Sequence, residues 1–323
     1  MNTNMQYTNL VKNDLDAVEQ KIRSQAIEFH GDLQNALDII LESGGKRIRP
    51  TVTILCGKMF NADTNRLVTL ASAIELLHTA TLVHDDLIDG AFLRRGVPTL
   101  NTHWSPGATV LTGDFLFAAA ANLAAETESI EVQKIFATTL KIIVNGEITQ
   151  MFGERCNVDR QIYKDRIFAK TASLFQTAAK SAGLISQTQP KEIHNLGIYG
   201  YEIGMAFQII DDILDFTGEQ ATVGKPVGSD LRHGLVTLPS LIFIESHSND
   251  ELVKMLLAGN CLEDLEKIDQ LIQNIQNSDA INKAFQVAND HVHKALDSIK
   301  DMRNCPEKSA LMAIAEYIID RDL

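Results

Sequence analysis

Apolar residues recur three and four positions apart along most of this chain, which is the spacing of one face of an α-helix. Runs in which β-branched residues alternate with polar ones, as in strands, are rare. The spacing predicts helices over 63–89, 106–127, 129–152, 162–182, 190–216, 262–275, 279–301 and 307–320. We therefore expect an all-α protein.

Helix-breaking residues fall between these segments and support the same division. A capping residue followed by a proline opens three of the segments, at "SP" (105–106), "TQP" (188–190) and "NCP" (304–306). No Pro/Ser-rich linker or low-complexity tract separates one part of the chain from another. We therefore expect residues 1–323 to form a single large helical domain.

Composition excludes several classes of protein. With 45% hydrophobic and 22% charged residues, the chain is expected to be soluble and globular. Its apolar stretches are interrupted by charge or are shorter than the roughly 20 residues of a membrane span, and its polar N-terminus does not resemble a secretory signal. The four cysteines lie far apart without a CxxC pair, which favours reduced thiols and a cytoplasmic location.

The formal net charge of -13 disfavours a nucleic-acid partner, because binding a phosphate backbone requires a cationic surface. The basic residues are concentrated in a few places: "GGKRIRP" (44–50), "LRRG" (93–96), the surroundings of Lys170, and Lys225 with Arg232. Basic residues gathered next to glycines in an acidic protein indicate that small anions are bound there.

Two motifs place three aspartates each at the end of an apolar run, and the six residues are Asp85, Asp86, Asp89, Asp211, Asp212 and Asp215. Residues four apart lie on one face of a helix, so the first and third aspartates of each motif point together. Such carboxylates repel one another unless a cation is bound between them. Ligands that are all oxygen suit Mg²⁺, which typically bridges carboxylates to substrate phosphates. The two motifs therefore predict a magnesium centre for a phosphorylated ligand.

A single motif of this kind is most often a solvated acidic turn, but both copies here follow apolar helical sequence, "TATLV" and "MAFQII". A calcium-binding EF-hand does not fit, because position 12 counted from Asp85 is Gly96 where that loop needs a glutamate. His78 precedes Asp85 by two helical turns on the same face, which favours a functional role over a core position.

These residues also carry a family resemblance. The chain resembles the trans-isoprenyl diphosphate synthases, also called polyprenyl synthetases, essentially from end to end. The resemblance rests on an ordered set of motifs: "GGKRIRP", "LLHTATLVHDDLID", "LRRGVPTLN", "LTGDFLFA", "FAKTASLF", "GMAFQIIDDILDF" and "GKPVGSDLRHG". It implies a bundle of long antiparallel helices around a deep central cavity, with both aspartate motifs at its mouth.

The resemblance also implies roles for individual residues. Several Mg²⁺ ions would be ligated by Asp85, Asp89 and Asp211, with Asp86, Asp212 and Asp215 close by. The allylic diphosphate would contact Arg94, Lys170 and Lys225. Isopentenyl diphosphate would occupy a metal-free pocket made by Lys46, Arg49, His78 and Arg95. Gln208 and Thr171 would be polar partners near the reacting carbons.

The implied reaction joins isopentenyl diphosphate head-to-tail to an allylic diphosphate through an allylic carbocation. The growing hydrocarbon would run along the helix that carries the first motif, past Leu77, Ala80 and Thr81. Ala80 and Thr81 are small, whereas short-chain members of the family block the channel near these positions. We therefore expect a long-chain product, from heptaprenyl to nonaprenyl, rather than farnesyl or geranylgeranyl diphosphate.

Other readings remain open at this stage. A non-catalytic subunit of a heteromeric synthase typically lacks some of the aspartates, and all are present here. A terpene cyclase or head-to-head synthase also ionises an allylic diphosphate, but a cyclase has no use for "GGKRIRP" or the Arg94 and Arg95 pair. We expect a homodimer, with the catalytic half of a heterodimer as the alternative, and at most transient contact with membranes. One departure from the family pattern is Leu235, where many relatives have lysine.

Overall fold

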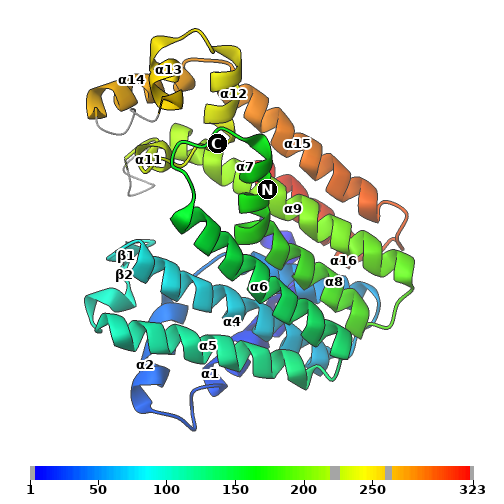
Figure 1. Ribbon diagram of the computed structural model, residues 1–323. Coiled ribbons are helices and arrows are strands. Elements are labelled where there is room, and N and C mark those ends of the chain that lie inside the picture. The colour runs from blue at the N-terminus through cyan, green and yellow to red at the C-terminus, as the bar shows by residue number, and fades with distance from the viewer. Residues whose placement is uncertain (1–3, 219–225, 259–263, 321–323) are drawn as a thin grey trace. The chain divides into compact units, whose positions relative to one another are not determined.

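The computed structural model describes residues 4–218, 226–258 and 264–320, and this part of the chain is almost entirely helical (Figure 1). The first elements are α1 (Asn4–Ser24), α2 (Gly31–Glu42), α3 (Ile48–Met59), α4 (Thr64–Ile88), β1 (Leu93–Arg94), β2 (Val97–Pro98), the 3₁₀ turn η1 (Leu100–Thr102), α5 (Pro106–Glu126) and α6 (Ile130–Phe152). The later elements are α7 (Arg160–Ile167), the π-helical segment η2 (Phe168–Ala172), α8 (Ser173–Ile185), α9 (Pro190–Thr217), α11 (Ser229–Arg232), α12 (Leu238–Ser246), α13 (Glu251–Leu257), α14 (Leu265–Gln276), α15 (Ala280–Ile299) and α16 (Pro306–Asp320).

The chain divides into two compact units. The first contains residues 1–139, 174–200 and 299–314, and the second contains residues 140–173, 201–298 and 315–323. Helices α6, α9 and α16 each begin in the first unit and end in the second. The single domain expected over 1–323 stays a prediction.

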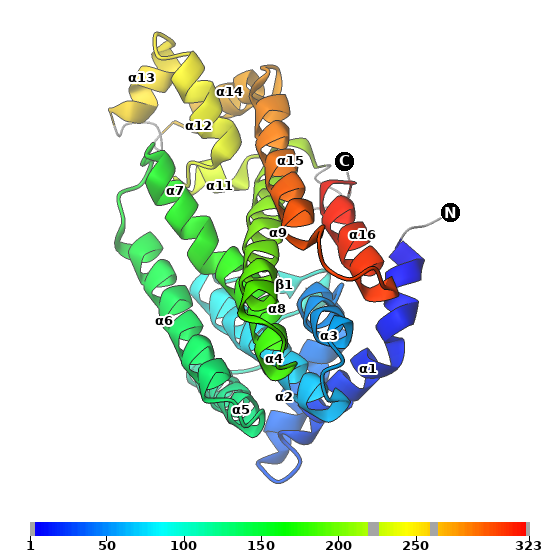
Figure 2. The same ribbon diagram turned by 90° about the vertical axis from the view of Figure 1, so that its right-hand side faces the viewer.

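Helix α4 forms the core of the first unit. It contacts α5, α3 and α1, and Figure 2 shows α1 and α3 on the same side of it. Its side chains are buried on nearly every face from Leu67 to Leu77, which is the pattern of a central helix rather than a surface one. This packing fixes the C-terminal end of α4, where the first aspartate motif lies.

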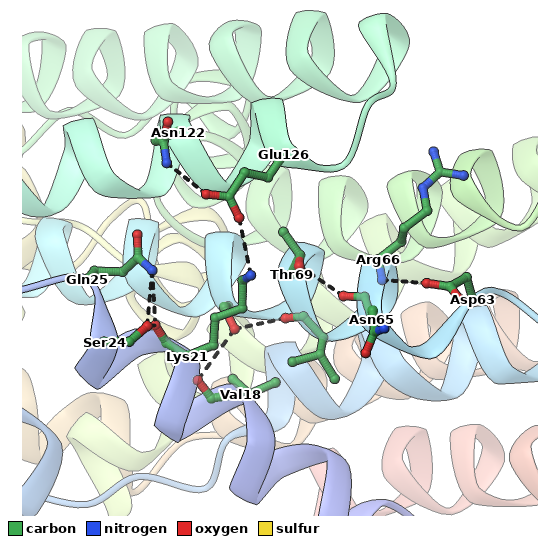
Figure 3. Close-up of polar contacts among 12 residues, drawn as sticks. Val18, Lys21, Ser24, Gln25, Asp63, Asn65, Arg66, Thr69, Asn122 and Glu126 are labelled. Atoms are coloured by element: carbon green, nitrogen blue, oxygen red, sulfur yellow. Dashed lines mark hydrogen bonds and ion pairs between the residues drawn. The ribbon is translucent and has the colours of Figure 1, made fainter.

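Polar contacts tie the N-terminal helix α1 to α4 and α5 (Figure 3). Ser72 Oγ lies 3.4 Å from the carbonyl oxygen of Val18, and Lys21 Nζ lies 3.2 Å from Glu126 Oε2. Arg66 Nη2 donates to the carbonyl oxygen of Thr127 at 2.7 Å and thereby closes the end of α5. These contacts hold the N-terminal half of α4 in place, whereas the first aspartate motif lies at its C-terminal end.

The second unit is assembled around the C-terminal half of α9. Arg166 Nη2 of α7 donates to the carbonyl oxygen of Val236 at 2.7 Å, just before α12. His291 Nδ1 of α15 lies 2.5 Å from Glu202 Oε2 of α9, and both side chains are largely buried. Helix α14 contacts α11, α12 and α13. These contacts surround the segment that carries the second aspartate motif.

The predicted all-α class is confirmed, and each predicted segment overlaps an observed helix. Three differences have physical causes. Helices α1, α2 and α11 to α13 were not predicted because they are short or rich in polar residues, whereas the helix expected to begin near Pro50 is α3. The helix expected over 162–182 is interrupted by the π-helical segment at Phe168–Ala172, which places one extra residue in the turn. The region of Leu93–Pro98 is a two-stranded antiparallel hairpin.

Helices α4 and α5 are long and apolar enough to cross a membrane by length and composition alone. In α4, however, 78% of the apolar window is buried inside the protein, as expected for a core helix. In α5 only 44% is buried, so part of its apolar surface faces outward. A soluble protein is consistent with this arrangement.

Candidate active site

The first aspartate motif occupies the last turn of α4. Asp86 is only 8% exposed, and both of its carboxylate oxygens accept from Arg94 Nε, at 2.9 and 3.0 Å. Asn101 Nδ2 donates to the carbonyl oxygen of Asp86 at 2.7 Å and so closes the end of the helix. Asp85 is partly exposed and Asp89 is exposed. The middle aspartate is therefore held within the protein, while its two neighbours reach the surface.

Basic side chains gather beside this motif in the first unit. Arg49 Nη1 lies 3.1 Å from His78 Nε2, and the Arg49 guanidinium carbon lies 4.6 Å from the centre of the Phe175 ring. Arg95 donates to the carbonyl oxygen of Gly44. A Cβ at Gly45 would lie 2.8 Å from Arg95 Nη1, so the glycine allows the loop and the arginine to approach each other. Lys46 lies exposed in the same loop.

His78 is neutral in this setting. Burial lowers its pKa well below the usual range, and the positive charges of Arg49, Arg95, Arg94 and Arg47 lower it further. Because a guanidinium can only donate, Nε2 of His78 accepts from Arg49 and the ring proton is on Nδ1. The ring therefore adds a hydrogen-bonding group to the pocket without adding a charge.

The depressed pKa of His78 predicts a pH-dependent stability. Below about pH 6.5 the unfolded chain binds a proton at this histidine that the folded chain does not, so stability falls as the pH is lowered. Replacing His78 by glutamine should remove this loss, which amounts to about 1.4 kcal/mol for each pH unit below about 6.5. Urea unfolding of both proteins at pH 8 and pH 5.5 measures it. An equal difference between the two proteins at both pH values would contradict the prediction.

The second aspartate motif lies near the end of α9 in the second unit, and its middle aspartate is also held internally. Asp212 is 3% exposed; it accepts from Tyr163 Oη at 2.6 Å and from Gln208 Nε2 at 3.0 Å. Gln208 Oε1 in turn accepts from Thr171 Oγ1 at 2.6 Å. A continuous chain of hydrogen bonds therefore joins Tyr163, Asp212, Gln208 and Thr171.

Burial raises the pKa of Asp212 to about 7, and the nearby charge of Asp230 adds to this effect. The hydrogen bonds from Tyr163 and Gln208 and the charge of Arg166 act in the opposite direction. Burial also raises the pKa of Tyr163 well above its usual range, so its hydroxyl remains a donor. A divalent cation near Asp212 would favour its charged form.

The third aspartate of this motif organises the segment that follows. Asp215 accepts from the backbone amides of Ser229 and Asp230, both at 3.1 Å, at the start of α11. Arg232 lies in the same short helix, where Nη2 contacts Asp269 Oδ1 at 2.5 Å and Nε donates to Val227. Arg232 thus connects α11 to α14. Lys225, which the family resemblance assigns to the allylic diphosphate, lies outside the described residues.

Lys170 and Thr171 lie on the π-helical segment. Lys170 Nζ lies 3.3 Å from Glu147 Oε1 of α6, and its side chain is exposed rather than surrounded by apolar residues. π-Helical turns are rare and often occur at functional sites, because the extra residue redirects the side chains of one turn. Here Thr171 is directed to Gln208.

The proposed wall of the hydrocarbon channel lies on α4. Leu77 and Ala80 are fully buried, whereas Thr81 is partly exposed and its hydroxyl donates to the carbonyl oxygen of His78 at 2.7 Å. His84 points to α5, where Nε2 lies 3.2 Å from the carbonyl oxygen of Val110. A Cβ at Gly113 would lie 2.2 Å from His84 Nε2, so this glycine makes room for the ring. His84 therefore has a packing role.

The predicted site residues are divided between the two units. The first unit contains Lys46, Arg49, Leu77, His78, Ala80, Thr81, Asp85, Asp86, Asp89, Arg94 and Arg95, and the second contains Lys170, Thr171, Gln208, Asp211, Asp212 and Asp215. Sequence reasoning missed Tyr163 and Asn101, which hold the two middle aspartates in position. Asn101 is the last residue of the motif "LRRGVPTLN", so the sequence contained a signal for it. No motif indicated Tyr163.

Carboxylates at the end of α4 are the candidate ligands for a magnesium ion in the first unit. Within residues 4–218, 226–258 and 264–320, no three Asp, Glu, His or Cys side chains converge as a preformed metal site requires. The donors at the surface are carboxylate oxygens from Asp85 and Asp89, which Mg²⁺ prefers. Mg²⁺ usually keeps several waters and binds one or two carboxylates together with substrate phosphates. These carboxylates therefore fit a magnesium ion that keeps several waters.

The family model for polyprenyl synthetase matches residues 30–275. The chain is 36% identical to heptaprenyl diphosphate synthase component 2 of Geobacillus stearothermophilus over 314 residues, which cover 97% of each chain.

Two solved structures have the same fold. Heptaprenyl diphosphate synthase from Staphylococcus aureus matches with a TM-score of 0.91 at 32% identity, covering 97% of this chain and 99% of that one. A polyprenyl synthase from Caulobacter crescentus, complexed with calcium and isoprenyl diphosphate, matches with a TM-score of 0.89 at 30% identity, covering 98% of each chain. The chain therefore belongs to the polyprenyl synthetase family.

Proposed function

We propose that this chain is a prenyltransferase that condenses isopentenyl diphosphate head-to-tail with an allylic diphosphate to give a long-chain trans-polyprenyl diphosphate. The observation that carries the proposal is the division of roles within each aspartate motif. The middle aspartates, Asp86 and Asp212, are buried and bonded to other side chains, whereas Asp85, Asp89 and Asp211 are at least partly exposed. This pattern supports Asp85, Asp89 and Asp211 as the ligands for Mg²⁺.

When bound, Mg²⁺ would neutralise the charge that develops on the departing diphosphate. In this proposal Arg94 and Lys170 contribute fixed positive charge toward the allylic diphosphate, together with Lys225. Asp86 keeps Arg94 oriented through its two-oxygen contact. Asp212 and Asp215 position their own helix and the start of α11. The related Caulobacter protein was solved with calcium, which is consistent with divalent metal use in the family.

Isopentenyl diphosphate is proposed to bind Lys46, Arg49, His78 and Arg95 without a metal. The neutral ring of His78 orients Arg49, while the loop at Gly44 orients Arg95. Separating the two diphosphates in this way ionises only the allylic one. The double bond of isopentenyl diphosphate then attacks the allylic cation, and a proton is lost to the departing diphosphate. Thr171 and Gln208 supply polar contacts near the reacting carbons.

Small side chains before the first motif support a long product. Ala80 presents only a methyl group, and Thr81 is the partly exposed residue of the same turn. The heptaprenyl synthases among the relatives support the same product class. The short-chain alternative would require an obstruction near these positions. We further propose that residues 1–323 form one cytoplasmic polyprenyl synthetase domain.

We propose that two copies of this chain associate through the exposed apolar face of α5. Leu111 is 68% exposed, and the neighbouring Val110, Ala118 and Ala121 are exposed as well. Asp114 and Asn122 are also exposed on this helix, so its outer face is apolar with two polar positions. Exposed apolar surface on a helix is typical of a protein–protein interface. The name "component 2" of the Geobacillus relative indicates that some members work with a different subunit, so a heterodimer is the alternative.

Replacing Leu111 by glutamate should convert the protein to monomers, because a charge in the centre of an apolar interface is left without a partner. Light scattering measures the change against a chain mass of 35.7 kDa. Leu265→Glu is a matched control, since Leu265 is 65% exposed at the start of α14. A wild-type protein that is monomeric when pure would contradict the homodimer.

The function is tested by diphosphate release from the purified chain with Mg²⁺ and farnesyl diphosphate, with and without isopentenyl diphosphate. The proposal expects release only when both substrates are present. Release from farnesyl diphosphate alone would instead identify a cyclase. No release with any allylic primer would point to a missing subunit, and adding the partner would then restore it.

A further inference from the structure

A buried carboxylate on α4 has no part in the function proposed above. Glu75 is only 4% exposed, and its Oε1 accepts from Arg47 Nη1 at 2.7 Å. A carboxylate is seldom buried without a strong reason, because removal from water disfavours its charge. Arg47 ends the loop that contains Lys46 and caps α3, whose first turn contains Arg49, so the pair lies directly beside the proposed isopentenyl diphosphate pocket.

Arg47 is held in an unusual backbone conformation by these contacts. Its φ angle is 47°, in the left-handed region that residues other than glycine rarely occupy. It precedes the first turn of α3, and its carbonyl oxygen accepts from Thr51 Oγ1 at 2.7 Å. Its second guanidinium nitrogen lies 3.4 Å from the carbonyl oxygen of Leu41. The guanidinium is therefore directed inward to Glu75 instead of outward with the exposed Lys46.

The charges of this pair act on the pocket in opposite directions. Arg47 is among the cations that lower the pKa values of His78 and Arg95. Glu75 raises the pKa of Arg95, which is the effect of a nearby negative charge. Arg94 has a comparable internal partner in Asp86. The cation cluster thus contains two arginines whose charges are offset by carboxylates of the protein.

We propose that Glu75 is a positioning residue that acts through Arg47 as its built-in counter-ion. The pair fixes the loop at residues 44–47 and the start of α3, and it cancels one positive charge, so that Lys46, Arg49 and Arg95 set the attraction for a diphosphate. This inference rests on the proposed function for the identity of the natural ligand. In this arrangement Glu75 limits how tightly the pocket holds diphosphate. Tighter binding of the anion alone would not increase the rate of the chemical step.

The test is the affinity of the purified protein for inorganic diphosphate, measured by calorimetry at low ionic strength with EDTA present. Glu75→Gln keeps a hydrogen-bond acceptor for Arg47 but removes the negative charge, so binding should tighten by about tenfold. Arg47→Gln leaves Glu75 uncompensated, so binding should weaken by about tenfold. The double variant should return to within about threefold of the wild type, because the two charges cancel.

A purely structural role predicts a different pattern, in which both single variants and the double variant bind more weakly. Weaker or unchanged binding in Glu75→Gln would therefore overturn the proposal. Arg47→Lys keeps the charge and should stay within about threefold of the wild type. Arg160→Gln with Glu245→Gln is the control pair, a surface ion pair at 2.5 Å whose loss should leave the affinity unchanged.

Folding of each variant is checked by circular dichroism and thermal unfolding, so that a misfolded variant is recognised before its affinity is measured. Wild-type protein that fails to bind inorganic diphosphate would also overturn the inference. Failure of the proposed function is read separately, from the absence of condensation product. A wild type that makes product while its variants show no opposed shifts would reject only the role of Glu75.

Discussion

Replacing Asp85 by asparagine should lower kcat/KM for condensation by about 10³-fold, the size of effect seen when one preorganised charge-stabilising group is removed. The reason is that the side chain would lose its charge and one hard oxygen ligand, while keeping its shape and its position on α4. Steady-state kinetics with farnesyl and isopentenyl diphosphates over a range of Mg²⁺ concentrations measures the effect. The variant should also require more Mg²⁺ for half-maximal rate.

Two other aspartate variants make the result specific. Asp16→Asn removes an exposed carboxylate from α1 and should leave the rate unchanged. Asp86→Asn should lower the stability by about 2 kcal/mol, because it weakens the largely buried contact with Arg94. Full activity in Asp85→Asn would remove Asp85 from the set of ligands. A loss of stability in Asp85→Asn as large as that in Asp86→Asn would indicate a structural role instead.

Replacing Thr81 by phenylalanine should shorten the product from the long-chain class to farnesyl or geranylgeranyl diphosphate. An aromatic ring one turn before Asp85 would obstruct the path proposed for the growing hydrocarbon. Thr81 is a better position than Ala80, because Thr81 is partly exposed whereas Ala80 is fully buried. A ring at Ala80 would overpack the core of the first unit and cost about 1–3 kcal/mol of stability. Mass spectrometry of the extracted products measures the chain length.

The matched control for Thr81→Phe is Thr81→Val. The Thr81 hydroxyl donates to the carbonyl oxygen of His78, so both replacements remove this bond but only phenylalanine adds bulk. We expect Thr81→Val to make the wild-type product at a similar rate. Unchanged chain length in Thr81→Phe would show that the hydrocarbon does not pass this residue, and a shorter product in Thr81→Val would assign the effect to the hydroxyl.

Much of the architecture was predictable because helical spacing is strong in the long apolar segments. Proline-based starts were accurate as well: Ser105 caps α5 by accepting from the backbone amide of Ala108, and Pro106 is the first helical residue. Helix α1 was missed although Val11, Val18 and Ile22 recur on one buried face. Its first half is polar, which obscured the periodic signal.

The site was predictable where function requires several charged residues close together in sequence, as in the two aspartate motifs. It was not predictable where contacts join distant segments. Tyr163 reaches Asp212 across 49 positions, and Arg47 reaches Glu75 across 28. Neither contact leaves a local pattern in the sequence. The π-helical turn at Lys170 and Thr171 also lacks such a signal, because helix-forming residues accommodate either geometry.

The central claim is tested most directly by the length of the product that this chain makes alone. Purified protein is incubated with Mg²⁺, farnesyl diphosphate and an excess of isopentenyl diphosphate, and the dephosphorylated products are separated and identified by mass. We predict a series of products that ends in the range from heptaprenyl to nonaprenyl. A series that stops at geranylgeranyl would contradict the proposal that Ala80 and Thr81 leave the hydrocarbon channel open. The absence of any elongated product would contradict the proposal that this chain catalyses the condensation without a different subunit.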